Sequence, residues 1–336
     1  MVAPARTHRT RRPLITDWRR PRSSMCQRHT FLPASLPDGA SDHLDTARTH
    51  GGDHARESIA RLSSRAVLTV TETLLELDDQ PVFLRRAGND PVPTIFLHAI
   101  GTSSFDWLAP LAQGGGIAVD LPGFGRSGKR GDLDYSLAGH VRFLDRLLDR
   151  LELDRVRLCG HDWGAAVGLA WAAEQPARVQ RLVVVNAVPL LGGFRWRGPA
   201  RLVRMPVVGP IAVGSGWQPI LRLISRRASA TPGPMPEPFV ESAAEGFDLG
   251  TERATRLLLR NSPPDVLARA GAKLGAITAP ALVVWGERDR WIPARFGSGY
   301  AAALGDATLE LVPDAGLWPW IDHPEVGARI VDYLAA

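Results

Sequence analysis

The stretch that decides the fold is residues 156–170, which read VRLCGHDWGAAVGLA. Residues 156–159 are largely apolar and predict a strand, and residues 165–170 are small and predict a helix. Residues 160–164 form a tight turn between them, with a glycine at each end. A strand, a tight turn and a helix in this order predict a nucleophile elbow, in which the central side chain projects above the sheet. That central residue is Asp162.

An aspartate at the centre of this turn predicts a different chemistry from a serine. A carboxylate is already ionised at neutral pH, so it can displace a halide or open an epoxide by direct attack and leave an alkyl ester on the protein. Gly160 and Gly164 permit the strained turn, and the N–H groups at the helix start face any negative charge that develops. We therefore expect Asp162 to be a nucleophile rather than a helix cap.

The rest of the body alternates strands with helices. This alternation predicts an α/β fold with a mostly parallel sheet covered by helices on both faces. Helical patterns fill residues 136–151, 164–174 and 325–335. The segments that predict strands are residues 68–77, 81–86, 94–98, 117–120, 156–159, 181–186, 281–285 and 308–312.

This pattern divides the chain into three regions. Residues 66–189 and 275–336 hold the predicted strands and form the α/β core. Residues 190–274 lack strand patterns and form a Gly- and Pro-punctuated insertion that favours helices. Residues 1–65 are rich in Arg, Pro, Ser and His without an apolar period, so we expect a disordered tail.

The composition excludes several classes of protein. The 336 residues are 45% hydrophobic and 22% charged, as in a globular protein, and no apolar run approaches the roughly 18 residues of a membrane span. Cys26 and Cys159 are the two cysteines and cannot form a disulfide framework. We therefore expect a protein of a reducing compartment, the cytoplasm.

The basic charge of the chain is confined to the tail. Residues 1–65 hold 12 Arg and 6 acidic residues, whereas the remaining 271 residues hold 28 basic and 29 acidic ones. A nearly neutral body does not favour nucleic-acid binding. We expect a small-molecule substrate and neither a nucleic-acid nor a membrane partner, and the sequence leaves the oligomeric state open.

Three further motifs flank the elbow. Residues 98–101 read HAIG, residues 120–128 read DLPGFGRSG, and residues 286–289 read GERD. Together with Asp162 they resemble the oxyanion turn, the DxPGxGxS loop and the acid-bearing turn of the α/β-hydrolase superfamily, in its epoxide hydrolase and haloalkane dehalogenase branch. The resemblance covers residues 68–336. It implies an α/β-hydrolase fold with an eight-stranded sheet, and a helical cap at residues 190–274.

The resemblance also implies roles for individual residues, without any metal or organic cofactor. Asp289 would orient a catalytic histidine, and the backbone N–H groups of Ile100 and Trp163 would be the oxyanion donors, in a turn that begins at His98. Many dehalogenases have a halide-binding Asn where this chain has Ile100. Substrate or halide contacts would then fall to indole groups, from Trp163, Trp196, Trp217 and Trp318.

The family's catalytic histidine is missing from this sequence. Its motif reads roughly DAGHWPW, whereas residues 314–320 read DAGLWPW, with Leu317 at the position of the base. Hydrolysis of an alkyl ester needs a water molecule that a base deprotonates, so the second half of the reaction loses its base. Four histidines remain in the body, and we expect structural or surface positions for them: His98 at a strand end, His140 on a polar helix face, His161 pointing away from the nucleophile, and His323 at a helix start.

Three functions remain open. The first is an enzyme resembling epoxide hydrolases, with Asp162 as nucleophile on a small apolar molecule and with doubtful hydrolytic turnover. Epoxide opening meets a further difficulty, because the family's cap tyrosines have no counterpart within residues 190–274. The second is a cofactor-free lyase, isomerase or cyclase, in which Asp162 is an acid or base in a dry pocket. The third is a catalytically silent ligand-binding protein.

Overall fold

The computed structural model describes residues 67–205, 228 and 235–336. The predicted disordered tail and part of the predicted cap, including Trp217, lie outside these residues. Within them, no helix combines the length and the apolar character needed to span a bilayer.

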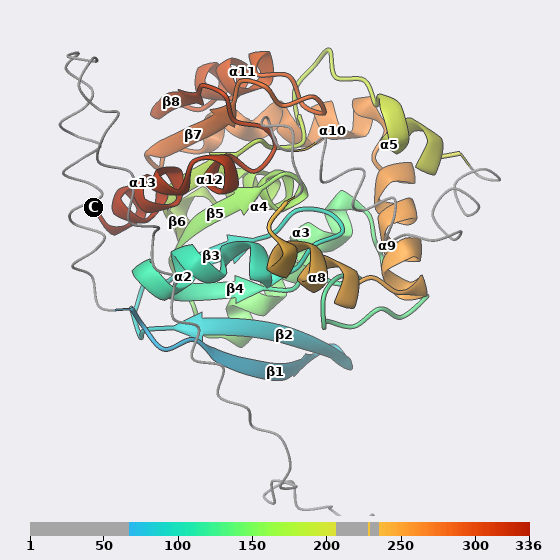
Figure 1. The fold of residues 1–336 in the computed structure, drawn as a ribbon, viewed down its shortest axis with the longest axis vertical. Helices are drawn as coiled ribbons and strands as arrows, with labels where there is room; N and C mark the ends of the chain where they lie inside the picture. Colours follow the sequence, from blue (N-terminus) through green and yellow to red (C-terminus); the bar gives the residue numbers. More distant parts are fainter. Residues whose placement is uncertain (1–66, 206–227, 229–234) are drawn as a thin grey trace, which may run out of the picture. The chain divides into compact units, whose positions relative to one another are not determined.

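One eight-stranded sheet organises this part of the chain (Figure 1). The strand order is β1-β2-β4-β3-β5-β6-β7-β8; β2 pairs antiparallel with β1 and with β4, and all other pairs are parallel. The predicted α/β class and the number of strands are confirmed. The strands are β1 (Thr71–Leu77), β2 (Gln80–Ala87), β3 (Thr94–Leu97), β4 (Gly116–Val119), β5 (Val156–His161), β6 (Val179–Val185), β7 (Ala281–Gly286) and β8 (Ala307–Val312).

The predicted strand boundaries were wrong at several ends. Residues 68–70 precede β1, and the Leu68 N–H donates to the carbonyl of Ala112 at 2.8 Å rather than to a neighbouring strand. β5 continues two residues further than predicted because β6 pairs with it up to the end, with His161 opposite Val185.

Helices cover both faces of the sheet. α2 and α13 pack together on one face, and α3 and α4 pack together on the other (Figure 1). α4 is buried from Trp163 to Ala173 because its residues are almost all small or apolar. The helices are η1 (Ser104–Trp107), α2 (Leu108–Gly114), α3 (Leu137–Arg150), α4 (Trp163–Glu174), η2 (Pro176–Arg178), α5 (Gly198–Val203), α8 (Glu237–Glu245), α9 (Leu249–Arg260), α10 (Pro264–Ala270), η3 (Gly271–Ala276), α11 (Arg295–Ala303), α12 (Pro319–Asp322) and α13 (Pro324–Ala335).

His140 on α3 lies in the interior, and the prediction of a polar helix face was wrong. It follows Leu137 by three residues and precedes Leu144 by four, so it shares their buried face. Its Nδ1 lies 2.9 Å from the carbonyl oxygen of Ser136, and its Nε2 lies 3.2 Å from that of Pro122. Burial lowers the pKa of His140, which keeps the ring neutral.

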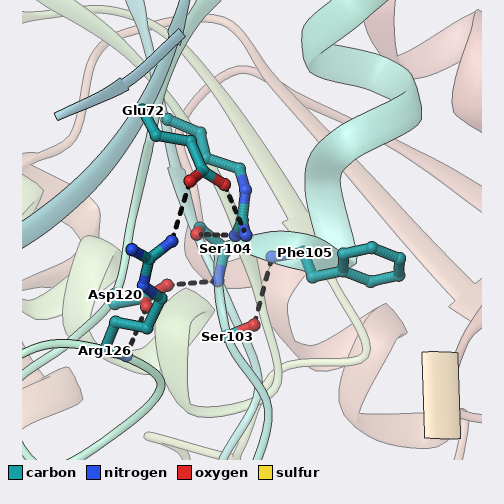
Figure 2. Close-up of polar contacts among 7 residues, drawn as sticks. Glu72, Ser103, Ser104, Phe105, Asp120 and Arg126 are labelled. Atoms are coloured by element: carbon teal, nitrogen blue, oxygen red, sulfur yellow. Dashed lines mark hydrogen bonds and ion pairs between the residues drawn. The ribbon is translucent and has the colours of Figure 1, made fainter. Parts of the chain in front are cut away.

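Asp120, directly after β4, ties two loops together (Figure 2). Its Oδ1 accepts the N–H of Ser104 at 2.7 Å, and its Oδ2 accepts the N–H of Arg126 at 2.7 Å. Glu72 of β1 then forms ion pairs with Arg126 at 2.8 Å and with Arg85 at 3.2 Å. These contacts hold η1, and the turn that precedes it, at the carboxyl edge of the sheet.

The described parts of residues 190–274 form helices and no strand. Lys129, from the loop after β4, donates to the carbonyl of Gly246 at 2.8 Å and pairs with Asp248 at 3.0 Å. Arg253 of α9 donates to the carbonyl of Lys129 at 2.5 Å. These contacts join α8 and α9 to the core, and the role of this region as a cap stays a prediction.

Gly164 marks a close approach between α4 and β3. Its N–H donates to the carbonyl of His98 at 3.1 Å. A Cβ atom at Gly164 would lie 2.3 Å from the carbonyl oxygen of Leu97 and 2.6 Å from that of His98, both of which belong to the backbone. At Gly168, one turn later, a Cβ would first meet a Leu97 side-chain methyl group at 3.3 Å.

We predict that Gly164→Ala lowers the free energy of unfolding by about 3 kcal/mol, because the backbone atoms that the new methyl group meets cannot move aside. Gly168→Ala is the matched control on the same helix and should change the free energy of unfolding by less than about 1 kcal/mol. Urea unfolding of both variants measures the difference. Equal effects would contradict the close approach.

Candidate active site

Asp162 lies at the turn between β5 and α4. Its φ of 50° and ψ of −113° place a non-glycine residue in the left-handed region, where a side chain is strained. The turn is held on both sides, because the Asp162 N–H donates to the carbonyl of Val185 and the Asp162 carbonyl accepts the N–H of Val188, each at 3.1 Å. The residue is 6% exposed, and its side chain faces the loop after β3.

Backbone N–H groups contact the Asp162 carboxylate. Its Oδ2 accepts the N–H of Ile100 at 3.1 Å. This N–H and that of Trp163 both favour the ionised form of Asp162. The two groups expected to be oxyanion donors thus both act on Asp162. Burial nevertheless raises the pKa of Asp162 to about 7, and the nearby charge of Asp289 adds to the rise.

Asp289 lies in the turn after β7 and is held by three donors. Its Oδ1 accepts the N–H groups of Trp291 at 2.7 Å and Ile292 at 3.0 Å, and its Oδ2 accepts the Asn186 side-chain amide at 2.7 Å. Burial raises the pKa of Asp289 to about 6 in spite of these hydrogen bonds. The carboxylate is therefore fixed in place without a histidine partner.

Asn186 is a site residue that the sequence analysis missed. It follows β6 with a φ of 40°, and besides its bond to Asp289 its Oδ1 accepts the N–H of Gly286 at 3.1 Å. The signal in the sequence is a polar residue directly after the apolar run of β6. Asn186 anchors the acid-bearing turn to the neighbouring strand.

Leu317 occupies the position where the resemblance places the base. Its N–H donates to the carbonyl of Ala228 at 2.8 Å, and its carbonyl accepts the Nε2–H of His161 at 2.7 Å. The side chain is largely buried and aliphatic. It can accept no proton from a water molecule.

The histidines of the described chain do not replace the missing base. The His98 Nε2 accepts the N–H of Leu121 at 2.9 Å, and its Nδ1 lies 2.7 Å from the Ala99 carbonyl oxygen, so both ring nitrogens have backbone partners. Its fully buried ring is therefore structural, as expected for a histidine at the end of a strand, and is not free to deprotonate water. Burial lowers the pKa of His161 to about 3, so that ring is neutral. His323 lies at the start of α13, with its Nδ1 3.2 Å from Glu325.

The tryptophans predicted to contact substrate pack against other aromatic rings where the structure describes them. Trp196 stacks on Trp163 with ring centroids 5.8 Å apart and planes 17° apart. The Trp196 indole N–H donates to the carbonyl of Ser262 at 2.9 Å, so in this structure it is not free to donate to a halide as expected. Trp318 packs against His161 and Phe239, with centroids at 5.3 and 5.4 Å. Trp217 lies outside the described residues.

Asp106 in η1 is a third buried carboxyl, and the sequence analysis missed it. It is 5% exposed, and its Oδ2 accepts the Thr102 hydroxyl at 2.6 Å and the N–H of Ala99 at 3.3 Å. Burial raises the pKa of Asp106 to about 7, and the negative charge of Asp162 adds to this. The signal in the sequence is an acidic residue between two aromatic ones, Phe105 and Trp107.

The site is therefore acidic. Among the residues that the structure describes, no cationic side chain contributes to the pKa of Asp106, Asp162 or Asp289. The same residues include no cluster of His, Cys, Asp and Glu arranged to hold a metal ion. A strained, partly protonated carboxyl beside backbone donors is suited to nucleophilic attack or to proton transfer.

We predict that Asp162→Asn stabilises the protein at pH 8 but not at pH 4. The pKa of Asp162 is higher in the folded state, so stability is lost as pH rises from about 4 to about 7. The amide avoids that loss, which is at most about 4 kcal/mol for a shift of this size. Thermal unfolding at both pH values measures the effect, and an equal gain in Tm at pH 4 would contradict the assigned shift.

Known proteins are similar in sequence to this chain over most of its length. The chain is 32% identical over 291 residues to the haloalkane dehalogenase of Mycolicibacterium paratuberculosis, a match that covers 77% of this chain and 90% of that protein. It is 28% identical over 277 residues to a 2-hydroxy-6-oxononadienedioate/2-hydroxy-6-oxononatrienedioate hydrolase of Paraburkholderia xenovorans (strain LB400), covering 74% and 89% of the two chains.

A solved structure and a family profile agree on the fold. The epoxide hydrolase CorEH superposes with a TM-score of 0.68 over 80% of this chain and 99% of its own, and at 20% identity this likeness supports the fold alone. The profile of the Alpha/beta hydrolase family matches residues 94–330. The predicted α/β-hydrolase fold is confirmed, and the chain belongs to the alpha/beta hydrolase family.

Proposed function

We propose that this member of the hydrolase family uses Asp162 as a nucleophile on a small apolar electrophile, either an epoxide or an alkyl halide. The observation that carries the proposal is a carboxylate at a strained elbow, with the N–H of Ile100 on one of its oxygens. The haloalkane dehalogenase among the relatives, at 32% identity, supports this reaction class. No cofactor is needed for the attack, because the carboxylate itself supplies the electron pair.

In the first step an oxygen of Asp162 forms a bond to carbon while the carbon–halide or carbon–oxygen bond of the substrate breaks. Only the ionised carboxylate has the required electron pair available. Because the pKa of Asp162 is about 7, the reactive fraction grows through neutral pH. The rate of alkylation by an alkyl halide, whose leaving group needs no proton, should therefore rise with pH and level off above about pH 8.

In the second step water adds to the carbonyl carbon of the ester, and the N–H groups of Ile100 and Trp163 are positioned to stabilise the resulting oxyanion. Leu317 cannot accept the proton of that water. Asp289 would orient a base in the family, but here it is bound by Asn186 and two backbone N–H groups. We infer that ester hydrolysis, which lacks a histidine base, is the slower of the two steps.

Residues 190–274 act in this proposal as the cap over the nucleophile. Three contacts support the assignment: Trp196 stacks on Trp163, the carbonyl of Ala228 accepts the N–H of Leu317, and Phe239 packs edge-on against Trp318. Aromatic and aliphatic side chains favour an uncharged, apolar substrate.

A cofactor-free lyase, isomerase or cyclase is the second candidate. The raised pKa of Asp162 favours it, because a carboxyl group with a pKa near 7 can both donate and accept a proton at neutral pH. In that reaction the substrate would be converted without a covalent ester. Such a reaction needs no activated water molecule, so the lack of a base at position 317 would not slow it.

We predict that an alkyl ester accumulates on Asp162 when the protein is incubated with 1,2-epoxyhexane or 1-bromobutane. Intact-protein mass spectrometry should show the mass of one adduct, and peptide mapping should place it on Asp162. Leu317→His should shorten the lifetime of the ester by at least about 100-fold, because an imidazole can deprotonate water. Leu317→Gln is the matched control, being polar and of similar size but no base.

Three outcomes separate the candidates. An adduct on Asp162 that disappears in the Asp162→Asn variant supports the proposed nucleophile. Conversion of a substrate without any adduct in rapidly quenched samples favours the lyase, isomerase or cyclase. Binding with neither adduct nor conversion, also in the Leu317→His variant, favours a ligand-binding protein and refutes the nucleophile.

A further inference from the structure

Asp106 and Asp120 differ in how many of their carboxylate oxygens accept hydrogen bonds. Both oxygens of Asp120 accept backbone N–H groups, from Ser104 and Arg126, and its carboxylate is fully used in holding those loops. Asp106 has its hydrogen bonds on Oδ2 alone, and its Oδ1 accepts none from the residues that the structure describes. One oxygen of Asp106 therefore remains available for another partner.

The Trp318 indole N–H is a second polar group near Asp106 without a hydrogen-bond partner in the described chain. It is buried, and it lies close enough to Asp106 to favour the charged form of that carboxyl. Buried donors are rarely left without a partner, so the Trp318 N–H and the second oxygen of Asp106 are two neighbouring polar groups that can still take part in hydrogen bonds.

Thr102 allows Asp106 to change protonation state without losing a hydrogen bond. The Thr102 hydroxyl lies 2.6 Å from Asp106 Oδ2 and 3.0 Å from the carbonyl oxygen of Ala99, and it has only one proton. When Asp106 is ionised, Thr102 donates to it. When Asp106 is protonated, Asp106 donates to the Thr102 oxygen and Thr102 donates to Ala99.

Asp106 and Asp162 are held by consecutive backbone amides. The N–H of Ala99 contacts Asp106 and the N–H of Ile100 contacts Asp162, so both carboxyls bind the turn after β3. The charge of Asp162 makes ionisation of Asp106 harder. Alkylation of Asp162 removes that charge, so Asp106 loses its proton more easily at the stage when a base is needed.

Few other titratable groups face Asp106. On the strand that leads into this turn, His98 is neutral because its Nε2 accepts a hydrogen bond and burial lowers its pKa. α8 also packs on η1, and its acidic residues Glu237, Glu241 and Glu245 are exposed to solvent. After burial, Asp162 is thus the charged group of the described chain that raises the pKa of Asp106.

We propose that Asp106 is the proton-transfer residue of this site, taking over the work of the histidine that Leu317 replaces. The inference rests on the proposed function of Asp162. With an epoxide, Asp162 bonds to carbon, the carbon–oxygen bond breaks, and the released oxygen takes the proton of Asp106. A tyrosine of the cap would give this proton in the resembling family, but residues 190–274 contain no tyrosine. Asp106 supplies the proton instead.

Hydrolysis of the ester then uses the ionised Asp106. It takes a proton from water as the water oxygen bonds to the ester carbonyl carbon. The tetrahedral intermediate collapses, the alkyl oxygen leaves with the proton held by Asp106, and a single proton remains shared between Asp106 and Asp162. The sum is addition of one water molecule to one epoxide, with both carboxyls restored.

The test compares Asp106→Asn with the unmodified protein on 1-bromobutane and on 1,2-epoxyhexane, with quenched-flow mass spectrometry of the Asp162 ester. Bromide leaves without a proton, so the variant should form the ester from 1-bromobutane at a rate within about threefold of the original. Formation from the epoxide should fall by about 100-fold, and hydrolysis of either ester should also fall by about 100-fold. A wild-type rate of ester hydrolysis in Asp106→Asn would overturn the inference.

Thr102 provides a second variant that keeps Asp106 in place. Thr102→Val removes a hydrogen bond that favours the ionised carboxyl, so the midpoint of the pH profile for ester hydrolysis should move to higher pH. Thr102→Ser retains the hydroxyl and should keep the original midpoint. A pH profile that does not move in Thr102→Val, or that is flat in the unmodified protein, would refute Asp106 as the base. Absence of any ester on Asp162 would refute the proposed function itself, and this inference with it.

Discussion

The close contact between Gly164 at the start of α4 and the end of β3 is the constraint on which the site depends. The N–H of Gly164 donates to the carbonyl of His98, and no side chain separates the two backbones. This approach brings Asp162 to the turn that follows β3, within hydrogen-bond distance of the Ile100 N–H. Backbone packing therefore sets the position of the carboxylate before any side chain of the site takes part.

The same arrangement places unfavourable charge in the interior. Asp106, Asp162 and Asp289 are buried, each has a raised pKa, and no cation of the described chain compensates them. Asp162 adds backbone strain at positive φ. Strain and buried charge persist where the surrounding structure is rigid, and here the sheet and the Asp120 network in Figure 2 provide that rigidity.

Sequence patterns were reliable where local chemistry decides the structure. The tight turn at Asp162 and the eight strands are readable from neighbouring residues. Patterns failed where the partner is distant in the chain. His140 lies on the buried face of α3, where the carbonyl of the distant Pro122 is a partner for its ring, and the Trp196 indole N–H is used by Ser262, which is 66 residues away.

The sequence by itself determined the fold class, the order of the strands along the chain and the identity of the residue at the elbow, because each follows from the spacing of apolar residues and glycines over a few turns of chain. Only the tertiary structure decided that Asp106 and Asp162 accept consecutive N–H groups, from Ala99 and Ile100, and that Asn186 holds Asp289. The physical reason is that a pKa and an unfilled hydrogen bond depend on burial and on partners from other strands. Neither is encoded in the residues next to the carboxyl along the chain.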